Sequence, residues 1–126
     1  MSNKIMLVDD SAYMRGVLKN ILRGAGYTAF VEASNGADAV GTYQKEKPDL
    51  VLMDIVMPQK NGIEALRDIK EIDAEARVVM VTAIGQEVIR NEAAEAGAEG
   101  FIVKPFEAGQ VRETVERVLL HGGDTG

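Results

Sequence analysis

The chain has 126 residues, of which 46% are hydrophobic and 27% are charged, as is typical of a single globular domain. It contains no cysteine, which excludes disulfides, thiol nucleophiles and thiolate metal ligands. Its 20 acidic and 14 basic residues give a net charge of −6 without a basic run, which argues against sequence-independent binding to nucleic acid and favours a basic partner or a cation.

Membrane segments and export signals are not expected either. The apolar runs are only a few residues long, far short of the roughly 20 residues that a membrane-spanning helix needs. Near the N-terminus, a short apolar run leads directly into Asp9 and Asp10, without the longer apolar region and cleavage site of a signal peptide. We therefore expect a cytoplasmic protein that does not bind membranes.

In chain order, five short apolar runs alternate with segments of helical periodicity. The runs have the length and composition of strands and are residues 5–8, 27–31, 50–53, 78–81 and 101–103. The first helical segment follows Ser11 and has apolar residues three or four positions apart as far as Ala25. The same spacing occurs over residues 37–43, 63–72 and 88–96, and in a last helix with Val111, Val115, Val118 and Leu119 on one side.

Glycine and proline mark the expected boundaries. Gly24 and Gly26 end the first helix, Gly97 ends the fourth, and Pro48 precedes the third strand. Strands that are apolar nearly throughout are covered on both faces, so the alternation predicts an α/β fold with a parallel five-stranded sheet between helices. We expect one domain over residues 1–121 and a polar, glycine-rich, flexible tail at 122–126.

The polar residues that end the predicted strands are candidates for a functional site, because ligands of open parallel sheets bind at the carboxyl ends of the strands. These residues are Asp9 and Asp10 after the first strand, Asp54 after the third, Thr82 after the fourth and Lys104 after the fifth. We therefore expect three carboxylates, one hydroxyl and one amine at a single edge of the sheet.

Three adjacent carboxylates would repel one another unless a positive charge lay among them. Oxygen ligands without cysteine or a suitably placed histidine favour a hard cation, and Mg²⁺ prefers one or two carboxylates together with water and phosphate oxygens. A magnesium ion and Lys104 beside one carboxylate would neutralise an incoming phosphoryl group and leave that carboxylate free to attack it. Thr82 could donate a hydrogen bond to a phosphoryl oxygen.

Each candidate also has an ordinary structural explanation. Asp10 and Ser11 suit the N-cap of a helix, and Asp54 suits a turn after a strand. The functional interpretation rests on the coincidence that four of the five predicted strands end in compatible groups. A glycine-rich phosphate loop or a dinucleotide-binding turn is absent from the sequence, so neither offers an alternative site.

The sequence around these residues resembles the receiver domain of two-component response regulators. The resemblance rests on the motifs Asp9-Asp10, Met53-Asp54-Ile55-Val56-Met57-Pro58, Asn61-Gly62, Val81-Thr82-Ala83 and Phe101-Ile102-Val103-Lys104-Pro105-Phe106. It covers the chain from about Lys4 to Leu120 and is strongest for the single-domain receivers of chemotaxis systems. It implies a flavodoxin-like (βα)5 three-layer sandwich with strand order 2-1-3-4-5.

The resemblance also implies a role for each site residue. Asp54 would be the phosphoacceptor for the phosphohistidine of a histidine kinase, and Lys104 would pair with the phosphoryl group. Asp10, Asp54 and the backbone carbonyl of Val56 would bind Mg²⁺, and Asp9 would contribute through water.

The implied output is a change of surface. Thr82 would move to the phosphoryl oxygen, Phe101 would turn inward, and the face of the fourth helix, fifth strand and fifth helix would change. The Lys104-Pro105 bond would be cis. Such a protein is a signalling switch and not an enzyme with turnover. As a monomer it would connect a chemotaxis-type histidine kinase with a flagellar motor switch protein or an archaeal motility adaptor.

Two features depart from the common pattern of the family. Phe101 stands where tyrosine is frequent, so a hydroxyl that some partners bind is missing. Val56 and Ile84 are apolar at positions that are polar in many relatives and that influence hydrolysis of the aspartyl phosphate. We therefore expect slower loss of phosphate than in a Val56→Asn variant.

Three other functions fit parts of the pattern. A stand-alone phosphorelay receiver would pass the phosphoryl group from Asp54 to a second histidine protein and differs only in its partner. A phosphatase of the haloacid dehalogenase type also uses an aspartyl phosphate and Mg²⁺, but it usually has Asp-x-Asp and a cap insertion, whereas Asp9 and Asp10 are adjacent. A degenerate receiver would lack an acidic residue or the lysine, and all of them are present.

Overall fold

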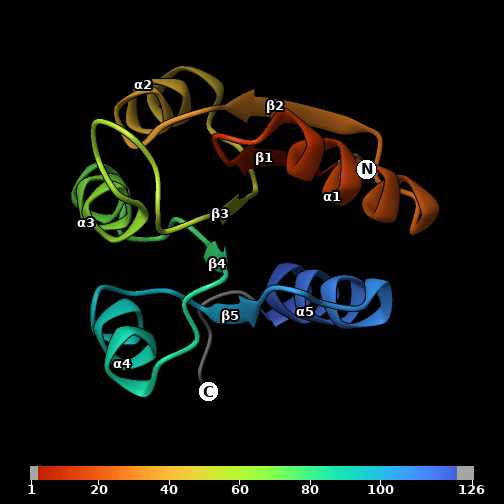
Figure 1. The fold of residues 1–126 in the computed structure, drawn as a ribbon. Helices are drawn as coiled ribbons and strands as arrows, with labels where there is room; N and C mark the ends of the chain where they lie inside the picture. The colour runs from red at the N-terminus through yellow and green to blue at the C-terminus, as the bar shows by residue number, and fades with distance from the viewer. Residues whose placement is uncertain (1–2, 122–126) are drawn as a thin grey trace.

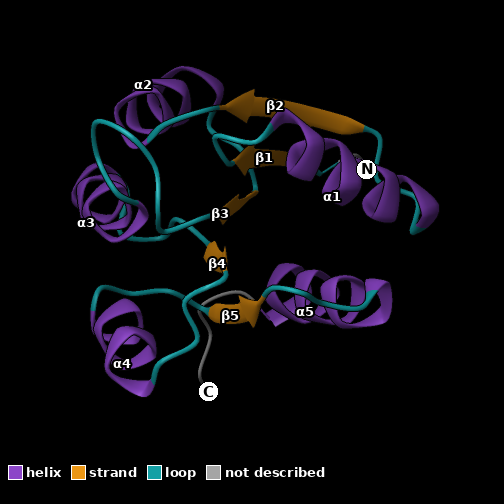
Figure 2. Ribbon diagram, in the orientation of Figure 1, coloured by secondary structure: helices purple, strands orange, loops and turns teal. Residues whose placement is uncertain are grey.

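The computed structural model describes residues 3–121, so the tail expected at 122–126 lies outside the described part of the chain. The five strands are β1 (Lys4–Val8), β2 (Ala29–Ala33), β3 (Leu50–Met53), β4 (Val78–Thr82) and β5 (Gly100–Val103). The helices are α1 (Ala12–Gly24), α2 (Gly36–Glu46), α3 (Gly62–Ile72), α4 (Glu87–Glu95) and α5 (Ala108–His121). Strands and helices alternate, with a loop between each strand and the next helix (Figure 2).

The strands form one parallel sheet in the order β2-β1-β3-β4-β5, and helices cover both of its faces (Figure 1). This arrangement confirms the predicted flavodoxin-like α/β fold and its strand order. Within residues 3–121, no helix combines the length and the apolar character that a membrane crossing requires.

Two clusters of buried side chains hold the helices on the sheet. Leu18 and Leu22 of α1 join residues of α5 on one face, and residues of α2, α3 and α4 pack on the other. Successive residues of a strand alternate between the faces, and in β1 Leu7 belongs to the first cluster whereas Met6 and Val8 belong to the second. The strands β1, β3 and β4 are therefore buried on both sides, as the sequence indicates, whereas the edge strands β2 and β5 are buried only in part.

The second strand begins two residues later than the sequence predicts. β2 runs from Ala29, which lies opposite Lys4 of β1, and not from Tyr27. The main-chain N–H of Tyr27 donates to the carbonyl of Leu22 at 3.0 Å, and Gly26 has a φ of +100°. Tyr27 therefore belongs to the turn that closes α1, and its apolar side chain packs against the core from that turn.

Candidate functional site

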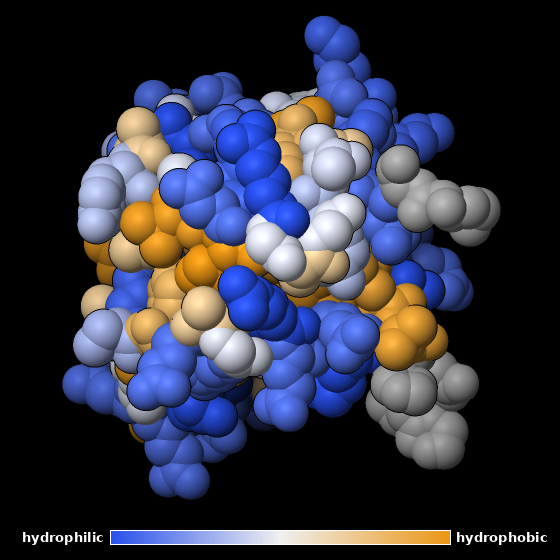
Figure 3. Space-filling model, turned by 90° about the vertical axis from the view of Figure 1, so that its right-hand side faces the viewer, coloured by the Kyte–Doolittle hydropathy of each residue, from blue (hydrophilic) through white to orange (hydrophobic). Residues whose placement is uncertain are grey.

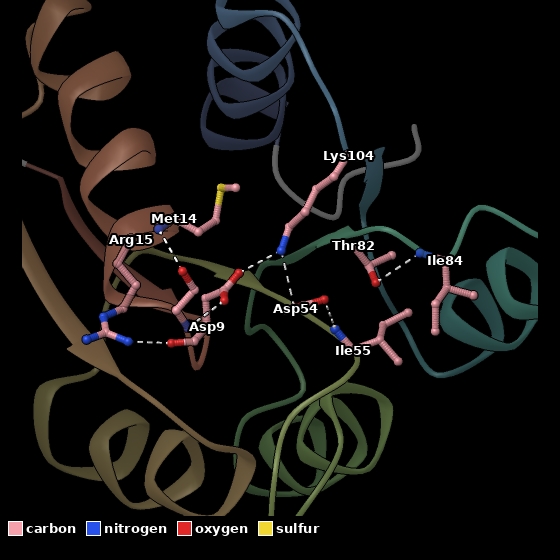
Figure 4. A network of polar contacts seen from close by, with 9 residues as sticks. Asp9, Met14, Arg15, Asp54, Ile55, Thr82, Ile84 and Lys104 are labelled. Carbon is pink, nitrogen blue, oxygen red and sulfur yellow. Dashed lines mark hydrogen bonds and ion pairs between the residues drawn. The ribbon is translucent and has the colours of Figure 1, made fainter.

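The ends of four strands bring the predicted site residues to one edge of the sheet (Figure 4). One carboxylate oxygen from each of Asp9, Asp10 and Asp54 lies within 4.8 Å of the others. Asp9 is 2% exposed and Asp54 is 8% exposed, whereas Asp10 is open to solvent. The cluster thus has two buried acids beside one exposed acid.

Lys104 bridges the two buried acids. Its Nζ lies 2.8 Å from Oδ2 of Asp9 and 3.3 Å from Oδ2 of Asp54. Burial alone would lower the pKa of Lys104, but the hydrogen bond to Asp9 and the charges of Asp54 and Asp9 outweigh burial and raise it. The ammonium group therefore stays protonated at neutral pH.

Main-chain groups fix the other oxygen of each buried carboxylate. The N–H of Ser11 donates to Oδ1 of Asp9 at 2.9 Å, and the N–H of Ile55 donates to Oδ1 of Asp54 at 2.7 Å. Ser11 is also the N-cap of α1, since its hydroxyl accepts from the N–H of Met14 at 3.2 Å. The cap at the start of α1 is therefore provided by Ser11, which leaves the Asp10 carboxylate available for another role.

The loop after β3 is held against the start of α3. Asn61 and Glu64 form a capping box, and the N–H of Gly62 donates to the carbonyl of Ile55 at 2.8 Å. A Cβ at position 62 would collide with the carbonyl of Asp54, so this close approach requires glycine. The packing of α3 therefore sets the main-chain position of Asp54.

The donor set of this edge fits a hard divalent cation. Three carboxylates and one ammonium leave an excess of negative charge, and all of the available ligand atoms are oxygens. Asp10 is the acid among them that faces solvent and is not engaged by Lys104. Val56, whose carbonyl is a metal ligand that the sequence resemblance implies, follows Asp54 by two residues and is 59% exposed.

The two predicted switch residues lie on neighbouring strands. Thr82 ends β4 with 0% exposure, and its Oγ1 accepts a hydrogen bond from the N–H of Ile84 at 3.3 Å. Phe101 of β5 is partly buried and lies opposite Met80 of β4. The Lys104-Pro105 peptide bond is cis. The proposed movements of Thr82 and Phe101 stay predictions.

Two residues that support the site were not given that role from the sequence. Gly62 occurs in one of the motifs above, but its contact with Asp54 depends on how α3 approaches the loop. Arg15 of α1 donates from Nη1 to the carbonyl of Asp9 at 2.5 Å. Its position four residues after Ser11 is an ordinary place for a charged residue in a helix, so the sequence contains no signal for this contact.

Comparison with known proteins agrees with this geometry. The family model described as "Response regulator receiver domain" matches residues 5–116. Chemotaxis protein CheY of Bacillus subtilis is 49% identical over 119 residues, which are 94% of this chain and 99% of the relative. Chemotaxis protein CheY of Halobacterium salinarum is 47% identical over 119 residues, which are 94% of this chain and 98% of the relative.

A solved structure gives the same result for the fold. The CheX-CheY-BeF3-Mg²⁺ complex from Borrelia burgdorferi contains a chain that superposes with a TM-score of 0.89 at 35% sequence identity. The match covers 92% of this chain and 88% of that chain.

Proposed function

Because the chain belongs to the response regulator receiver family, we propose that it is a chemotaxis response regulator that is phosphorylated on Asp54 by a histidine kinase. The observation that carries this proposal is the bridge of Lys104 between Asp9 and Asp54 in a cluster that Asp10 completes. It puts a nucleophilic carboxylate beside a fixed positive charge at the edge of the sheet where ligands bind.

The proposed reaction transfers a phosphoryl group to a carboxylate oxygen of Asp54. A new O–P bond forms as the P–N bond of phosphohistidine breaks, and the electron pair of that bond stays on the imidazole nitrogen. Lys104, 3.3 Å from Oδ2 of Asp54, is placed to offset the charge that the phosphoryl oxygens bring. Asp10, Asp54 and the carbonyl of Val56, with Asp9 acting through water, would hold a magnesium ion, which would supply further positive charge to the phosphoryl group.

Signal output would come from the surface formed by α4, β5 and α5. The hydroxyl of Thr82 would exchange its contact with Ile84 for a phosphoryl oxygen, and Phe101 would turn inward into the space that is vacated. Phosphorylation would then shift an equilibrium between two arrangements of this surface.

The proposed partners follow from the similarity to the two CheY proteins. They are a chemotaxis-type histidine kinase on the input side and, on the output side, a flagellar motor switch protein or an archaeal motility adaptor, all in the cytoplasm. Residues 1–121 would form the receiver domain. Among the residues that the structure describes, the large apolar side chains that are exposed come from five separate segments, and on the face shown in Figure 3 hydrophobic surface forms only a band between hydrophilic residues. A monomer is the state that this distribution favours.

The test is the intact mass of the protein after incubation with acetyl phosphate, with and without Mg²⁺. We expect one added phosphoryl group in the unaltered protein when Mg²⁺ is present, and none in Asp54→Asn. Asp49→Asn is a matched control, because Asp49 precedes the other end of β3 and accepts a hydrogen bond from the N–H of Lys4; this variant should be labelled normally. Labelling of Asp54→Asn, or no labelling of any protein even with a chemotaxis kinase, would overturn the proposal.

The labelled protein also separates the alternatives. A chemotaxis switch keeps its phosphoryl group when mixed with a histidine phosphotransfer protein and binds a motility component more tightly, whereas a phosphorelay receiver gives the group up. A phosphatase of the haloacid dehalogenase type would release phosphate from organic monoesters over many turnovers. Neither transfer nor turnover is expected here.

A further inference from the structure

An arginine outside the acidic cluster holds the main chain of one of its members. Arg15 donates from Nη1 to the carbonyl of Asp9 at 2.5 Å and from Nε to Oε1 of Glu32 on β2 at 2.7 Å. Its side chain is 17% exposed. It approaches Asp9 from the side away from Lys104 (Figure 4). A single guanidinium group therefore joins α1, the end of β1 and β2.

Glu32 is anchored in turn by a second cation of α1. Lys19, four residues after Arg15 and so on the same side of the helix, donates from Nζ to Oε2 of Glu32 at 2.5 Å. The hydrogen bonds from Lys19 and Arg15 lower the pKa of Glu32, which keeps its carboxylate charged. The charged carboxylate of Glu32 therefore holds the side of the Arg15 guanidinium group that is turned away from Asp9.

The contact of Arg15 is made with the peptide group that joins Asp9 to Asp10. The side chain of Asp9 is already held by the N–H of Ser11 and by Lys104, and its own N–H donates to the carbonyl of Ala33 at 3.2 Å. The carbonyl of Asp9 lies in the same planar peptide unit as the nitrogen of Asp10. A hydrogen bond to that carbonyl therefore restricts rotation of this peptide unit, whose orientation contributes to the direction in which the Asp10 side chain leaves the main chain.

We propose that Arg15, anchored by Glu32, is a positioning residue that orients the Asp10 carboxylate for binding of a divalent cation. This inference rests on the proposed function, which gives Asp10 the role of a metal ligand. Asp10 is exposed, so the main chain before it contributes more to its orientation than packing does. Groups that orient metal ligands from outside commonly change metal affinity by about 10- to 100-fold when they are removed.

A simple charge effect would act in the opposite direction. Arg15 brings a positive charge close to a site for a cation, and its repulsion weakens cation binding. Removal of that charge alone would therefore tighten Mg²⁺ binding, whereas loss of the orientation of Asp10 would weaken it. The sign of the change separates the two roles.

The experiment is a titration of the full chain with Mg²⁺, followed by the backbone amide resonances of Asp10 and Asp54 in NMR spectra. We expect Arg15→Gln and Arg15→Lys each to raise the Kd for Mg²⁺ about tenfold, and to shift the amide resonance of Asp10 before any Mg²⁺ is added. Lys19→Gln is the matched control, since it removes one charge from the same network but leaves the bond to Asp9; its Kd should stay within about twofold of the unaltered protein.

Two patterns of results overturn the proposal. Tighter or unchanged binding by Arg15→Gln, together with unchanged binding by Arg15→Lys, would assign Arg15 a charge effect only. An equal loss of affinity in Lys19→Gln would show that the network acts through general stability, which thermal unfolding of each variant measures independently. If Arg15→Gln does not fold, Arg15→Lys, which keeps the charge, decides the question. If the unaltered protein does not bind Mg²⁺, the proposed function fails first, and this inference fails with it.

Discussion

The guanidinium carbon of Arg90 on α4 lies 5.0 Å from the centroid of the Phe101 ring on β5. The ring also packs against the core cluster on the face covered by α2, α3 and α4. A cation over the face of an aromatic ring is attracted by the ring's electron density. Arg90 therefore stabilises the observed orientation of the residue that, in the proposed switch, would turn inward.

Arg90→Gln should release the Phe101 ring. We expect the free energy of unfolding to fall by about 0.5–1 kcal/mol, and the NMR resonances of the ring to shift toward those of the phosphorylated protein. Arg23→Gln is the control, because Arg23 lies 5.9 Å from the ring centroid of Phe30, far along the chain from the switch. It should leave the Phe101 resonances unchanged. If the Phe101 ring had the same NMR resonances in Arg90→Gln as in the unaltered protein, the prediction would be contradicted.

Lys104→Met should destabilise the protein strongly, because it leaves two buried carboxylates without their shared ammonium group. Removal of one partner from a buried ion pair costs about 3–5 kcal/mol, and urea unfolding at pH 7 without divalent cations would measure the loss. Lys4→Met is the control, since the pair of Lys4 with Glu46 is more exposed and should contribute less than about 1 kcal/mol. Equal losses in the two variants would show that the bridge is not a major source of stability.

The architecture, and the fact that the site residues lie close together, were predictable from the sequence for a physical reason. Buried parallel strands are apolar nearly throughout, and their carboxyl ends share one edge of the sheet. The proximity of Asp9, Asp54 and Lys104 therefore follows from the sequence pattern alone. The start of β2 was not predictable, because Tyr27 is as apolar as a strand residue and only the hydrogen bond of its N–H to Leu22 assigns it to the turn.

The supporting contacts depend on main-chain orientation, which residue types do not encode. Arg15 binds a carbonyl group, and every residue has one, so its partner could not be identified from spacing. The same holds for the approach of Gly62 to the carbonyl of Asp54. Contacts between side chains of opposite charge, such as that of Lys104 with Asp54, are predictable where the fold brings two strand ends together.

Gly62→Ala should damage both stability and phosphorylation. Its Cβ would meet the carbonyl of Asp54, so the loop must shift, and we expect a loss of about 2–3 kcal/mol in the free energy of unfolding. The rate of labelling by acetyl phosphate should fall as Asp54 moves away from Lys104. Gly41→Ala is the control: position 41 lies inside α2 with open space around it, so alanine should stabilise the protein by about 0.5–1 kcal/mol. Normal labelling of Gly62→Ala would contradict this account.

The ion pairs of Glu32 should make a pH-dependent contribution to stability. Hydrogen bonds from Lys19 and Arg15 lower the pKa of Glu32 below its ordinary value of 4.5. Because the folded-state pKa is the lower one, the stabilisation is fully present above the ordinary value and is lost as the pH falls through the folded-state value. The Glu32 side chain is 37% exposed, so the contribution should not exceed about 1 kcal/mol. The measurement is the free energy of unfolding of the unaltered protein and of Glu32→Gln from pH 7 to pH 3. The difference between the two proteins should become smaller as the pH falls. A difference that does not depend on pH would contradict the prediction.

Val56 should slow the hydrolysis of the phosphoryl group on Asp54. Val56 follows Asp54 by two residues and is 59% exposed, so water reaches this residue close to Asp54 along the chain, and its side chain offers no group that could hydrogen-bond a water molecule. In Val56→Asn an amide could orient the attacking water, and the half-life of the phosphorylated protein should shorten severalfold. The measurement is the decay of the phosphorylated mass after acetyl phosphate is removed.

The control for this prediction has the same substitution at another exposed valine. Val88 of α4 is 74% exposed, so Val88→Asn makes the same change of side chain at a comparably open position of a different segment. The half-life of phosphorylated Val88→Asn should equal that of the unaltered protein, because Val88 belongs to α4 and not to the loop that follows Asp54. If Val88→Asn accelerated decay as much as Val56→Asn, the effect would come from a general change of the surface. If neither variant changed the rate, the side chain at position 56 would have no influence on the water that attacks the phosphoryl group.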